Sequence, residues 1–371
     1  MATKPSSSSN FPRFSRANSG KGLSFSAVDR YTIEVYYHLR QGERIDMLSF
    51  INALPGAVSQ GLIWGIMAIG VYITYKILDI ADLTVDGSFC TGAAVFVMLY
   101  TTGTNLWLAM LASLVAGMVA GLATGLLHTF CGIPAILAGI LTQLGLWSIN
   151  MAIMDMKATV AINVTQPEML DKLLVSLRFV QDAVNGTRPF YRHPILVVGI
   201  FTLVLIALLY WFFGTELGAS LRATGSNQSM ARAQGINTSF TKVLGLMISN
   251  GLVSLSGALL AQYNSASEIN MGRGAIVIGL AAVIIGEVAF SKVFHNFALK
   301  LLAVSIGAIL YYIVIQAVLA MGMNANYLKL LSAIVVAVFL SIPYWKGRYL
   351  HVQVKTAAPE VGAKMGGDRN A

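Results

Sequence analysis

Long apolar runs separated by short polar segments dominate the pattern along this chain. A helix needs about 20 apolar residues to cross the hydrocarbon core of a bilayer. Runs of about that length occupy residues 54–75, 105–127, 133–154, 194–213, 241–262, 297–321 and 327–343. The shorter runs at 88–102 and 275–290 predict steep or partial helices. Because the runs are continuous and do not alternate with polar positions, they favour helices over a barrel. The expected fold class is therefore all-α, a polytopic helical membrane protein with about eight or nine membrane segments.

Composition strengthens this prediction. Of the 371 residues, 56% are hydrophobic and 11% are charged, whereas soluble domains carry about 25% charged residues. A soluble globular enzyme is thereby excluded. The net charge of +9 lies mainly in the tails and short loops, so it favours membrane topology and contact with anionic lipid over nucleic-acid binding. Cys90 and Cys131 are too few for a disulfide framework or a metal cluster.

The chain divides into three regions by composition. Residues 1–53 form a polar, basic N-terminal tail whose second half could be an amphipathic helix on the membrane surface. Residues 54–343 form the membrane domain, and 344–371 form a polar C-terminal tail. Between two of the apolar runs, residues 165–192 could hold a short external helix, because their leucines recur at helical spacing.

Lysine and arginine in the loops predict the orientation in the membrane. The C-terminal tail and the 214–240 loop are basic and are expected on the cytoplasmic side. Counting spans back from there puts the basic N-terminal tail outside. Either that tail is extracellular or a re-entrant segment lies near Met47–Leu54, and the sequence leaves its side open.

Two polar stretches interrupt the apolar pattern at corresponding points of the chain. Leu78–Ser88 follows the first long run and Ser265–Gly274 follows a later one, and each leads into a short Gly/Ala-rich segment. Such paired breaks predict a two-half internal repeat and point to a transport pathway. The candidate pathway residues are Asp79, Asp82, Thr84, Asp86, Ser88, Glu268 and Asn270. The three aspartates could equally cap helix N-termini in an interfacial loop, so both interpretations stay open.

Other polar and small residues within the apolar runs have simpler explanations. Glu287 is expected to pair with Lys292 or to lie on a face that meets a partner. Glycines at 117, 121 and 125 share one helix face, which predicts close helix packing and no substrate site.

The 214–240 loop is the most distinctive polar element. It predicts a short helix that ends at Gly225, a cap at Ser226 or Asn227, and a second short helix over 228–234. A rigid knob of small residues suits the docking of a soluble partner. A plain amphipathic connector is the alternative.

The loop carries the pattern Leu-Arg-Ala-x-Gly-x-Asn followed by Ala-x-Ala-x-Gly-Ile. This pattern resembles the coupling loop of ABC importer permeases of the branched-chain amino acid and ribose type. The resemblance implies that these residues couple to an ATPase: Leu221, Arg222, Ala223, Gly225, Asn227, Ala231, Arg232, Ala233, Gly235 and Ile236.

Two further motifs extend the resemblance over nearly all of residues 54–343. The run 82–88 is similar to the Asp-Leu-Ser-Val-Gly-Ser run of sugar permeases, with Asp86 as an additional residue. The run 279–286 resembles the family's Ala-Ile-Ala-Ala-Val-Val-x-Gly-Gly pattern, except that Glu287 replaces the last glycine. Within the family, the chain looks most like permeases that work with binding proteins for aromatic amino acids and related small molecules.

The resemblance implies a multi-pass permease of the bacterial plasma (inner) membrane that forms the translocation pathway for a small organic solute. An amino acid is the first choice of solute, and a sugar or nucleoside is the second. The implied partners are cytosolic ABC ATPase subunits, an extracytoplasmic substrate-binding protein and a second, identical permease copy. ATP and magnesium would bind the ATPase, and no cofactor is expected on this chain.

The sequence also bears on alternatives from other classes. It lacks a G-x-x-x-x-G-K-[ST] loop to cradle phosphates, so ATP hydrolysis is expected on a separate subunit. An intramembrane serine protease is disfavoured because Ser254 and Ser256 have no evident histidine partner. An ion-coupled secondary transporter would explain the acidic residues at membrane depth, but not the 214–240 loop.

Overall fold

The computed structural model of the protein describes most of the predicted membrane domain. The described residues are 50–51, 53–162, 173–176, 193–290, 294, 296–320, 327, 330, 332–339 and 341. All of them belong to the unit Leu48–Ala371. The predicted amphipathic helix and the C-terminal tail lie outside these residues. The predicted external helix at 165–192 also lies largely outside them, although Leu173 and Leu174 are described and are not helical.

Helices form nearly all of this part of the chain, and the predicted fold class is confirmed. Among the described residues, 6 helices are long and apolar enough to cross a membrane. They are Ala53–Ile77, α3 (Leu106–Thr129), α4 (Ala135–Ile153), α7 (Pro194–Gly214), α10 (Thr238–Asn264) and α12 (Phe297–Ala320). The two predicted short helices are α2 (Val85–Thr101) and α11 (Ala275–Phe290). Of the predicted 327–343 span, residues 332–339 are described as helix.

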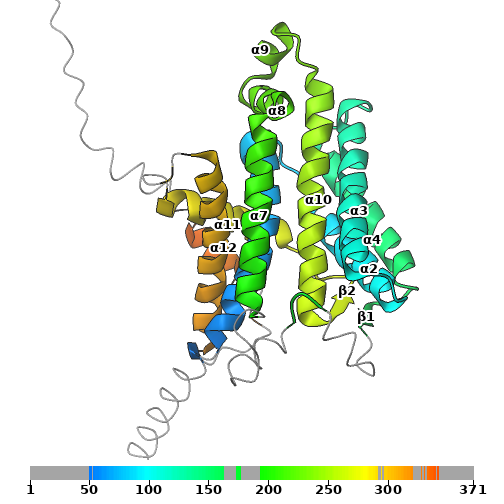
Figure 1. Ribbon diagram of the computed structural model, residues 1–371. Helices are drawn as coiled ribbons and strands as arrows, with labels where there is room; N and C mark the ends of the chain where they lie inside the picture. Colours follow the sequence, from blue (N-terminus) through cyan, green and yellow to red (C-terminus); the bar gives the residue numbers. More distant parts are fainter. Residues whose placement is uncertain are drawn as a thin grey trace, which may run out of the picture. The chain divides into compact units, whose positions relative to one another are not determined.

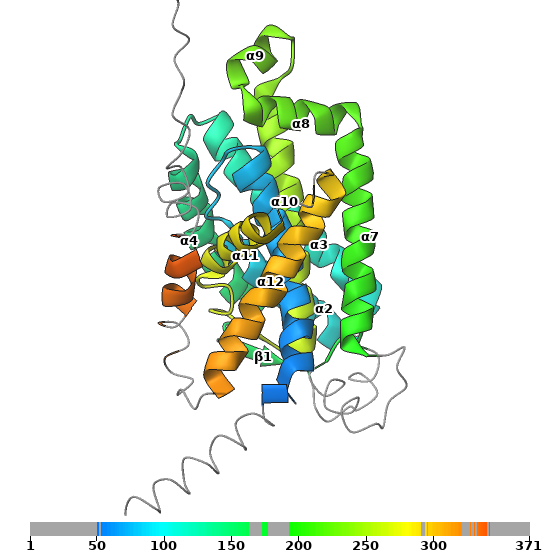
Figure 2. The ribbon, with the colours of Figure 1, turned by 90° about the vertical axis from the view of Figure 1, so that its left-hand side faces the viewer.

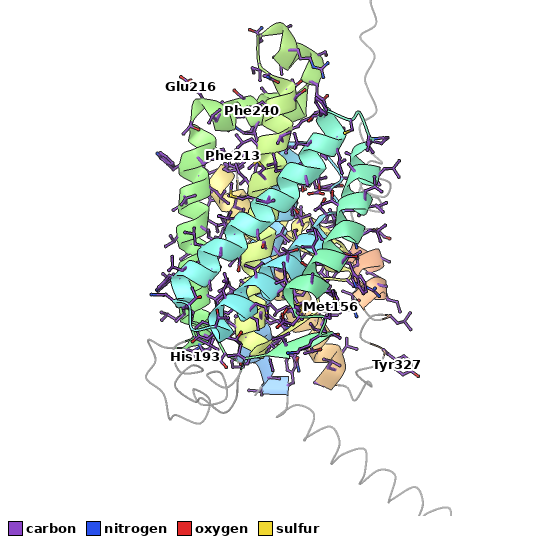
Figure 3. The ribbon with its side chains drawn as sticks, turned by 90° about the vertical axis from the view of Figure 1, so that its right-hand side faces the viewer. Met156, His193, Phe213, Glu216, Phe240 and Tyr327 are labelled. Atoms are coloured by element: carbon purple, nitrogen blue, oxygen red, sulfur yellow. The ribbon has the colours of Figure 1, made fainter. Side chains whose placement is uncertain are left out.

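The helix Ala53–Ile77 and α10 lie at the centre of the bundle, and α4 and α7 lie at its periphery (Figures 1 and 2). The two central helices are mostly buried, whereas α4 and α7 expose most of their apolar side chains. These outward side chains are visible on the surface in Figure 3. In a bilayer they would face lipid, which explains why peripheral helices are as apolar as central ones.

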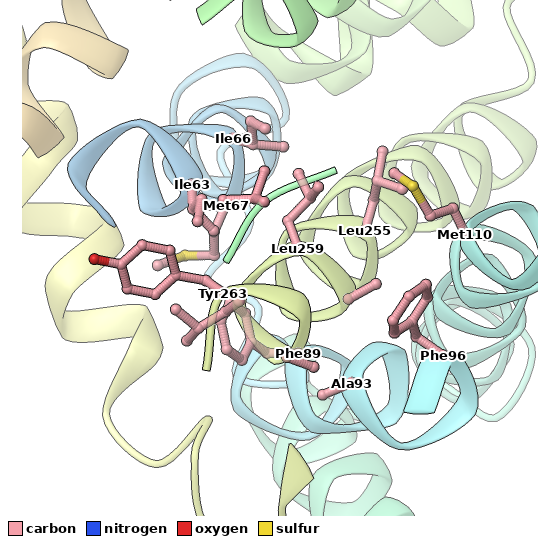
Figure 4. Close-up of a cluster of buried hydrophobic side chains, with 14 of the residues drawn as sticks. Ile63, Ile66, Met67, Phe89, Ala93, Phe96, Met110, Leu255, Leu259 and Tyr263 are labelled. Atoms are coloured by element: carbon pink, nitrogen blue, oxygen red, sulfur yellow. The ribbon is translucent and has the colours of Figure 1, made fainter. Parts of the chain in front are cut away.

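The largest hydrophobic cluster lies where the central helices meet α2 and α3. Ile63 and Met67 of the first span contact a cluster that includes Phe89 of α2, Met110 of α3 and Leu259 of α10 (Figure 4). Side chains from four helices therefore fill one core, and these helices form a single packed unit.

Glycines bring α3 into backbone contact with α10. A Cβ placed on Gly117 would overlap the carbonyl oxygen of Asn250, and one on Gly121 would overlap that of Leu246. Gly125 continues the same contact line against Val243. These contacts confirm the predicted packing role of this glycine face. In lipid the hydrophobic effect does not drive helices together, so the van der Waals contact that small residues permit supplies the attraction.

Gly121→Val is expected to destabilise this helix pair by about 1–3 kcal/mol, because overpacking a tight contact forces backbone shifts. The measurement is the midpoint temperature of unfolding of the purified protein in detergent. Gly145→Val on α4 is the matched control, because a Cβ there meets no atom within 4 Å. Equal midpoints for the two variants would contradict the packing role.

The order of the helices repeats, as the paired polar breaks predict. In each half, a long buried span ends in a polar break, and a short helix follows: Ala53–Ile77 leads to α2, and α10 leads to α11. The first span closes with a five-residue π-helix, η1 (Ile73–Ile77), a deviation that often marks functional positions in helices.

The sequence did not predict the small sheet at the second break. There, β2 (Ala266–Glu268) pairs antiparallel with β1 (Thr159–Ala161), which follows α4. This sheet lies at one end of the bundle, and the helices of the 214–240 loop lie at the opposite end (Figure 1).

Candidate functional site

The first polar break, Leu78–Ser88, is stabilised by a network of buried hydrogen bonds around Asp82. This side chain is 2% exposed. Its Oδ1 accepts a hydrogen bond from the backbone N–H of Thr84 (2.9 Å), and its Oδ2 accepts one from Nδ2 of Asn250 on α10 (2.7 Å). Oδ1 of Asn250 in turn accepts from Oγ of Ser88 (2.7 Å). A buried carboxylate is costly unless it is hydrogen-bonded, and these bonds offset that cost. They also tie the break to both α2 and α10.

Thr84 adds a third helix to this network. Its Oγ1 lies 2.7 Å from Oγ1 of Thr124 on α3, and both side chains are buried. Three of the predicted pathway residues, Asp82, Thr84 and Ser88, therefore lie together inside the protein, and the bonds described here are made to other buried groups.

Asp86 connects the two breaks. It belongs to α2, yet its Oδ2 accepts from the N–H of Gly274 (2.9 Å) and its Oδ1 accepts from the N–H of Ile276 (3.0 Å) at the start of α11. Nearby, Sγ of Cys90 accepts from the N–H of Gly272 (3.1 Å). The aspartate of one half thus caps the short helix of the other half, which is the capping role the sequence left open.

The remaining pathway candidates lie apart from this network. Asp79, Glu268 and Asn270 are all exposed, and Asp79 adopts a left-handed backbone conformation with φ of 54°. The structure therefore does not bring the seven candidate residues into one site. A role for them in solute passage stays a prediction.

The 214–240 loop forms two helices, with ends within one residue of the predicted ones. They are α8 (Glu216–Ser226) and α9 (Gln228–Ala233). Asn227 caps α9, because its Oδ1 accepts from the N–H of Met230 (3.0 Å). After α9, Gly235 adopts a left-handed conformation with φ of +81°, which favours glycine. Helix α8 crosses the end of the bundle, and α9 projects beyond it (Figure 2).

Helix α8 rests on the end of the first span. Leu221 is buried in a cluster with Leu78, and a Cβ placed on Gly225 would overlap the carbonyl oxygen of Ile77. A Cβ on Gly245 of α10 would likewise collide with the side chains of Leu78 and Leu221. The loop therefore contacts the backbone where η1 gives way to the first break.

The ten predicted coupling residues divide into an inward and an outward set. Leu221 and Ala231 are buried, and Ala223, Gly225 and Ile236 are half-buried. The exposed members are Arg222, Asn227, Arg232, Ala233 and Gly235. The two arginines are also held locally: Arg222 donates to the carbonyl of Phe213 (3.0 Å), and Arg232 donates to Oγ1 of Thr238 (2.8 Å).

The exposed apolar side chains of this loop were not predicted from the sequence. Met230 on α9 is 62% exposed, and Phe240 at the start of α10 is 54% exposed. Phe240 lies at the α8 end of the bundle, and Met156 and His193 lie at the other end (Figure 3). The available signal was the presence of large apolar residues in a loop rich in small and polar residues.

Glu287 makes an ion pair that the sequence did not indicate. Its Oε2 lies 3.2 Å from Nζ of Lys76 on η1, whereas the predicted partner Lys292 lies outside the described residues. The pair joins the first span to α11. Next to it is a cavity of about 720 Å³ that Lys76 lines together with Arg222 of α8 and Lys300 of α12.

Ser254 and Ser256 of α10 hold helices together. Ser254 donates to the carbonyl of Ser113 (2.6 Å), and Ser256 donates to that of Ile63 (2.7 Å). Within the part of the chain that the structure describes, no three His, Cys, Asp or Glu side chains gather where they could hold a metal ion.

Comparison with known proteins adds to this geometry. The sequence model of the family described as the branched-chain amino acid transport system permease component matches residues 54–340. A tyrosine transport system permease protein of Clostridioides difficile (strain R20291) is 38% identical over 291 residues, which are 78% of this chain and 91% of the relative. An uncharacterized protein of Rickettsia prowazekii (strain Madrid E) is 34% identical over 293 residues, which are 78% of this chain and 98% of the relative. The autoinducer 2 import system permease protein LsrC of Salmonella typhimurium is 27% identical over 240 residues, which are 64% of each chain.

Proposed function

The chain belongs to the family of permease components of branched-chain amino acid transport systems, and from this premise we propose that it forms the translocation pathway of an ATP-driven amino acid importer. As a member of this family it is an ABC transporter permease subunit, not an enzyme, and a multi-pass protein of the bacterial plasma membrane. The observation that carries the proposal of an ATP-driven mechanism is the α8–α9 loop, which projects from the bundle and rests on the first break.

The proposed power source is a pair of separate ATPase subunits that bind ATP and magnesium and dock on α8 and α9. Movement of α8 would reach Ile77 and Leu78 through the contact at Gly225. From there the Asp82–Asn250 hydrogen bond leads to α10. Because packed contacts transmit displacement with little compression, this route couples the loop to the core of the bundle.

The proposed assembly has two further partners. A substrate-binding protein would deliver solute at the end that holds β1 and β2, opposite the ATPase. A second permease copy would complete the pathway. An amino acid is the proposed solute because a relative at 38% identity carries the name of a tyrosine transport permease; a sugar or nucleoside is the alternative.

The proposal is tested by purifying the full chain with an affinity tag from its own host and identifying what accompanies it. We expect a stoichiometric ABC ATPase, and uptake of L-tyrosine into proteoliposomes that requires ATP, the ATPase and a binding protein. Uptake driven by an ion gradient with this chain alone would refute the proposal in favour of a secondary transporter. ATP-driven uptake of a sugar or nucleoside, without amino acid uptake, would refute the proposed substrate.

Met230→Asp is expected to weaken ATPase association about tenfold, because an exposed apolar side chain at a docking surface contributes about 1–2 kcal/mol when it is covered. Association is measured as the ATPase-to-permease ratio after dilution of the purified complex. Met156→Asp is the matched control, since Met156 is 74% exposed at the opposite end of the bundle. If both variants keep the wild-type ratio, α9 is not a docking element.

A further inference from the structure

A cavity of about 460 Å³ opens in the half of the bundle away from α8. Its walls come from the first span, the start of α11, α12 and the segment 332–333. Gln60 lies near the beginning of the first span, whose other end contacts α8, and Gln316 lies near the end of α12. The volume lies within the range of small-molecule sites, about 300–1,000 Å³.

Aromatic rings form one wall of this cavity. The Trp64 ring stacks on Phe89 with centroids 4.9 Å apart and lies 5.9 Å from the ring of Tyr312. Tyr311 packs edge-on against Tyr312 at 5.5 Å. A planar ring of a ligand could extend this stack, since offset and tilted aromatic pairs are favoured over isolated rings.

Trp64 also offers an unused hydrogen-bond donor. The residue is 6% exposed, and its Nε1 has no hydrogen-bond partner among the described residues. Burying a donor without a partner costs about 1–3 kcal/mol, so a buried unpaired donor in a native protein often has a functional role. An oxygen atom of a bound ligand would satisfy it.

Arg273 supplies the charge. Among the described residues that line the cavity, it alone carries a charged side chain. It is exposed and also lines a smaller cavity of about 190 Å³ beside Asp86. Asp86 already accepts from the N–H groups of Gly274 and Ile276 at the start of α11, so the guanidinium is the cation that can bind an anionic group here. Its planar donors match a carboxylate.

We propose that this cavity binds an aromatic α-amino acid on its way through the permease, with the ligand carboxylate on Arg273 and the ligand ring against Trp64 and Tyr312. Gln60 and Gln316 also line the cavity, and their amide oxygens can accept hydrogen bonds from the ammonium group. This inference rests on the proposed function and deepens it, because it assigns the solute class to residues of this chain.

The test is binding of radiolabelled L-tyrosine to the purified full chain in lipid nanodiscs, with displacement by unlabelled L-tyrosine and by tyramine, which lacks the carboxylate. We expect the wild-type chain to prefer L-tyrosine about tenfold. Arg273→Gln should weaken L-tyrosine binding about tenfold, equivalent to about 1.4 kcal/mol, and leave tyramine binding within about twofold. Lys157→Gln is the matched control, an exposed cation outside the cavity.

Trp64→Phe is a second, independent variant that keeps a ring and deletes the indole N–H. It should weaken L-tyrosine binding about fivefold, which is within the usual worth of one hydrogen bond, whereas Trp107→Phe on the outer surface of α3 should have no effect.

Three results would overturn the proposal: no displaceable L-tyrosine binding by the wild-type chain, unchanged binding in the Arg273 variant, or equal losses for L-tyrosine and tyramine. The binding assay uses no ATPase. L-tyrosine binding without ATP-driven uptake would therefore refute the proposed importer but leave the proposed binding site in the cavity standing. ATP-driven L-tyrosine uptake without binding here would refute the cavity alone.

Discussion

Gly225→Val is expected to lower ATP-driven uptake by at least about a hundredfold while the chain still inserts into the membrane. Gly225 lies on α8 against the backbone of Ile77 and Leu78, with no room for a Cβ. A branched side chain would push α8 away from the first break. Overpacking of this kind costs about 1–3 kcal/mol, and a hundredfold loss corresponds to about 2.7 kcal/mol. The contact that is lost is the one through which the loop is proposed to act on the bundle.

The measurement is uptake and ATP hydrolysis in the same proteoliposomes, together with the amount of permease in the membrane fraction. Gly214→Val is the matched control, because Gly214 begins the same loop and a Cβ there meets no atom within 4 Å. We expect hydrolysis to persist in the Gly225 variant without transport. Wild-type uptake in this variant would show that the contact between α8 and the first break carries no coupling.

Most of the fold could be predicted because a lipid bilayer restricts which sequences and backbone structures can span it. Apolar runs of span length can only be helices, since backbone groups in hydrocarbon must bond internally, and α3 and α7 lie within a few residues of the predicted runs. The contact of Gly121 with α10 was also predictable, because small residues on one helix face have few other uses in a membrane.

The parts that could not be predicted depend on contacts between distant segments. Asp86 was recognised as a possible cap, but nothing local to it indicates that the first N–H group it accepts from, that of Gly274, lies 188 residues later. Lys76 and Glu287 likewise pair across 211 residues, and nothing near either residue in the sequence indicates this partner. The pairing of β1 with β2 has no periodic signature, because each strand has only three residues.

The 214–240 loop shows the same limit within a single motif. Its two helices follow from the cap at Asn227 and the left-handed Gly235, which are local signals. Which face turns inward is not local: Leu221 is buried by Leu78 and α10, whereas Met230 is exposed. A resemblance that names ten residues therefore mixes those that anchor the loop with those that are free to meet a partner.

Asp86→Ala is expected to reduce uptake more than tenfold and to leave ATPase association unchanged. The substitution deprives the N–H groups of Gly274 and Ile276 of their acceptor. These N–H groups are partly buried, so losing their acceptor costs less than the ~1–3 kcal/mol of a fully buried donor, and the loss of a helix cap costs about 0.5–2 kcal/mol. The start of α11 would come loose from α2, and Arg273, which precedes Gly274 and lines the 460 Å³ cavity, would lose its position. The Asp86 side chain bonds to the start of α11, whereas the α8–α9 loop contacts the first break at Ile77 and Leu78.

Two further variants separate the cap from its charge. Asp86→Asn keeps an oxygen acceptor and should lose less uptake than Asp86→Ala. Asp155→Asn removes the charge of an exposed aspartate outside the predicted pathway residues, and asparagine tolerates its left-handed conformation, so its uptake should match wild type. Uptake of L-tyrosine and the ATPase-to-permease ratio are measured on the same preparations. A parallel fall of both quantities in Asp86→Ala would assign Asp86 to folding of the whole bundle. A fall in uptake alone would place its role in linking the two breaks, because that link is what the alanine variant removes while the docking loop stays intact.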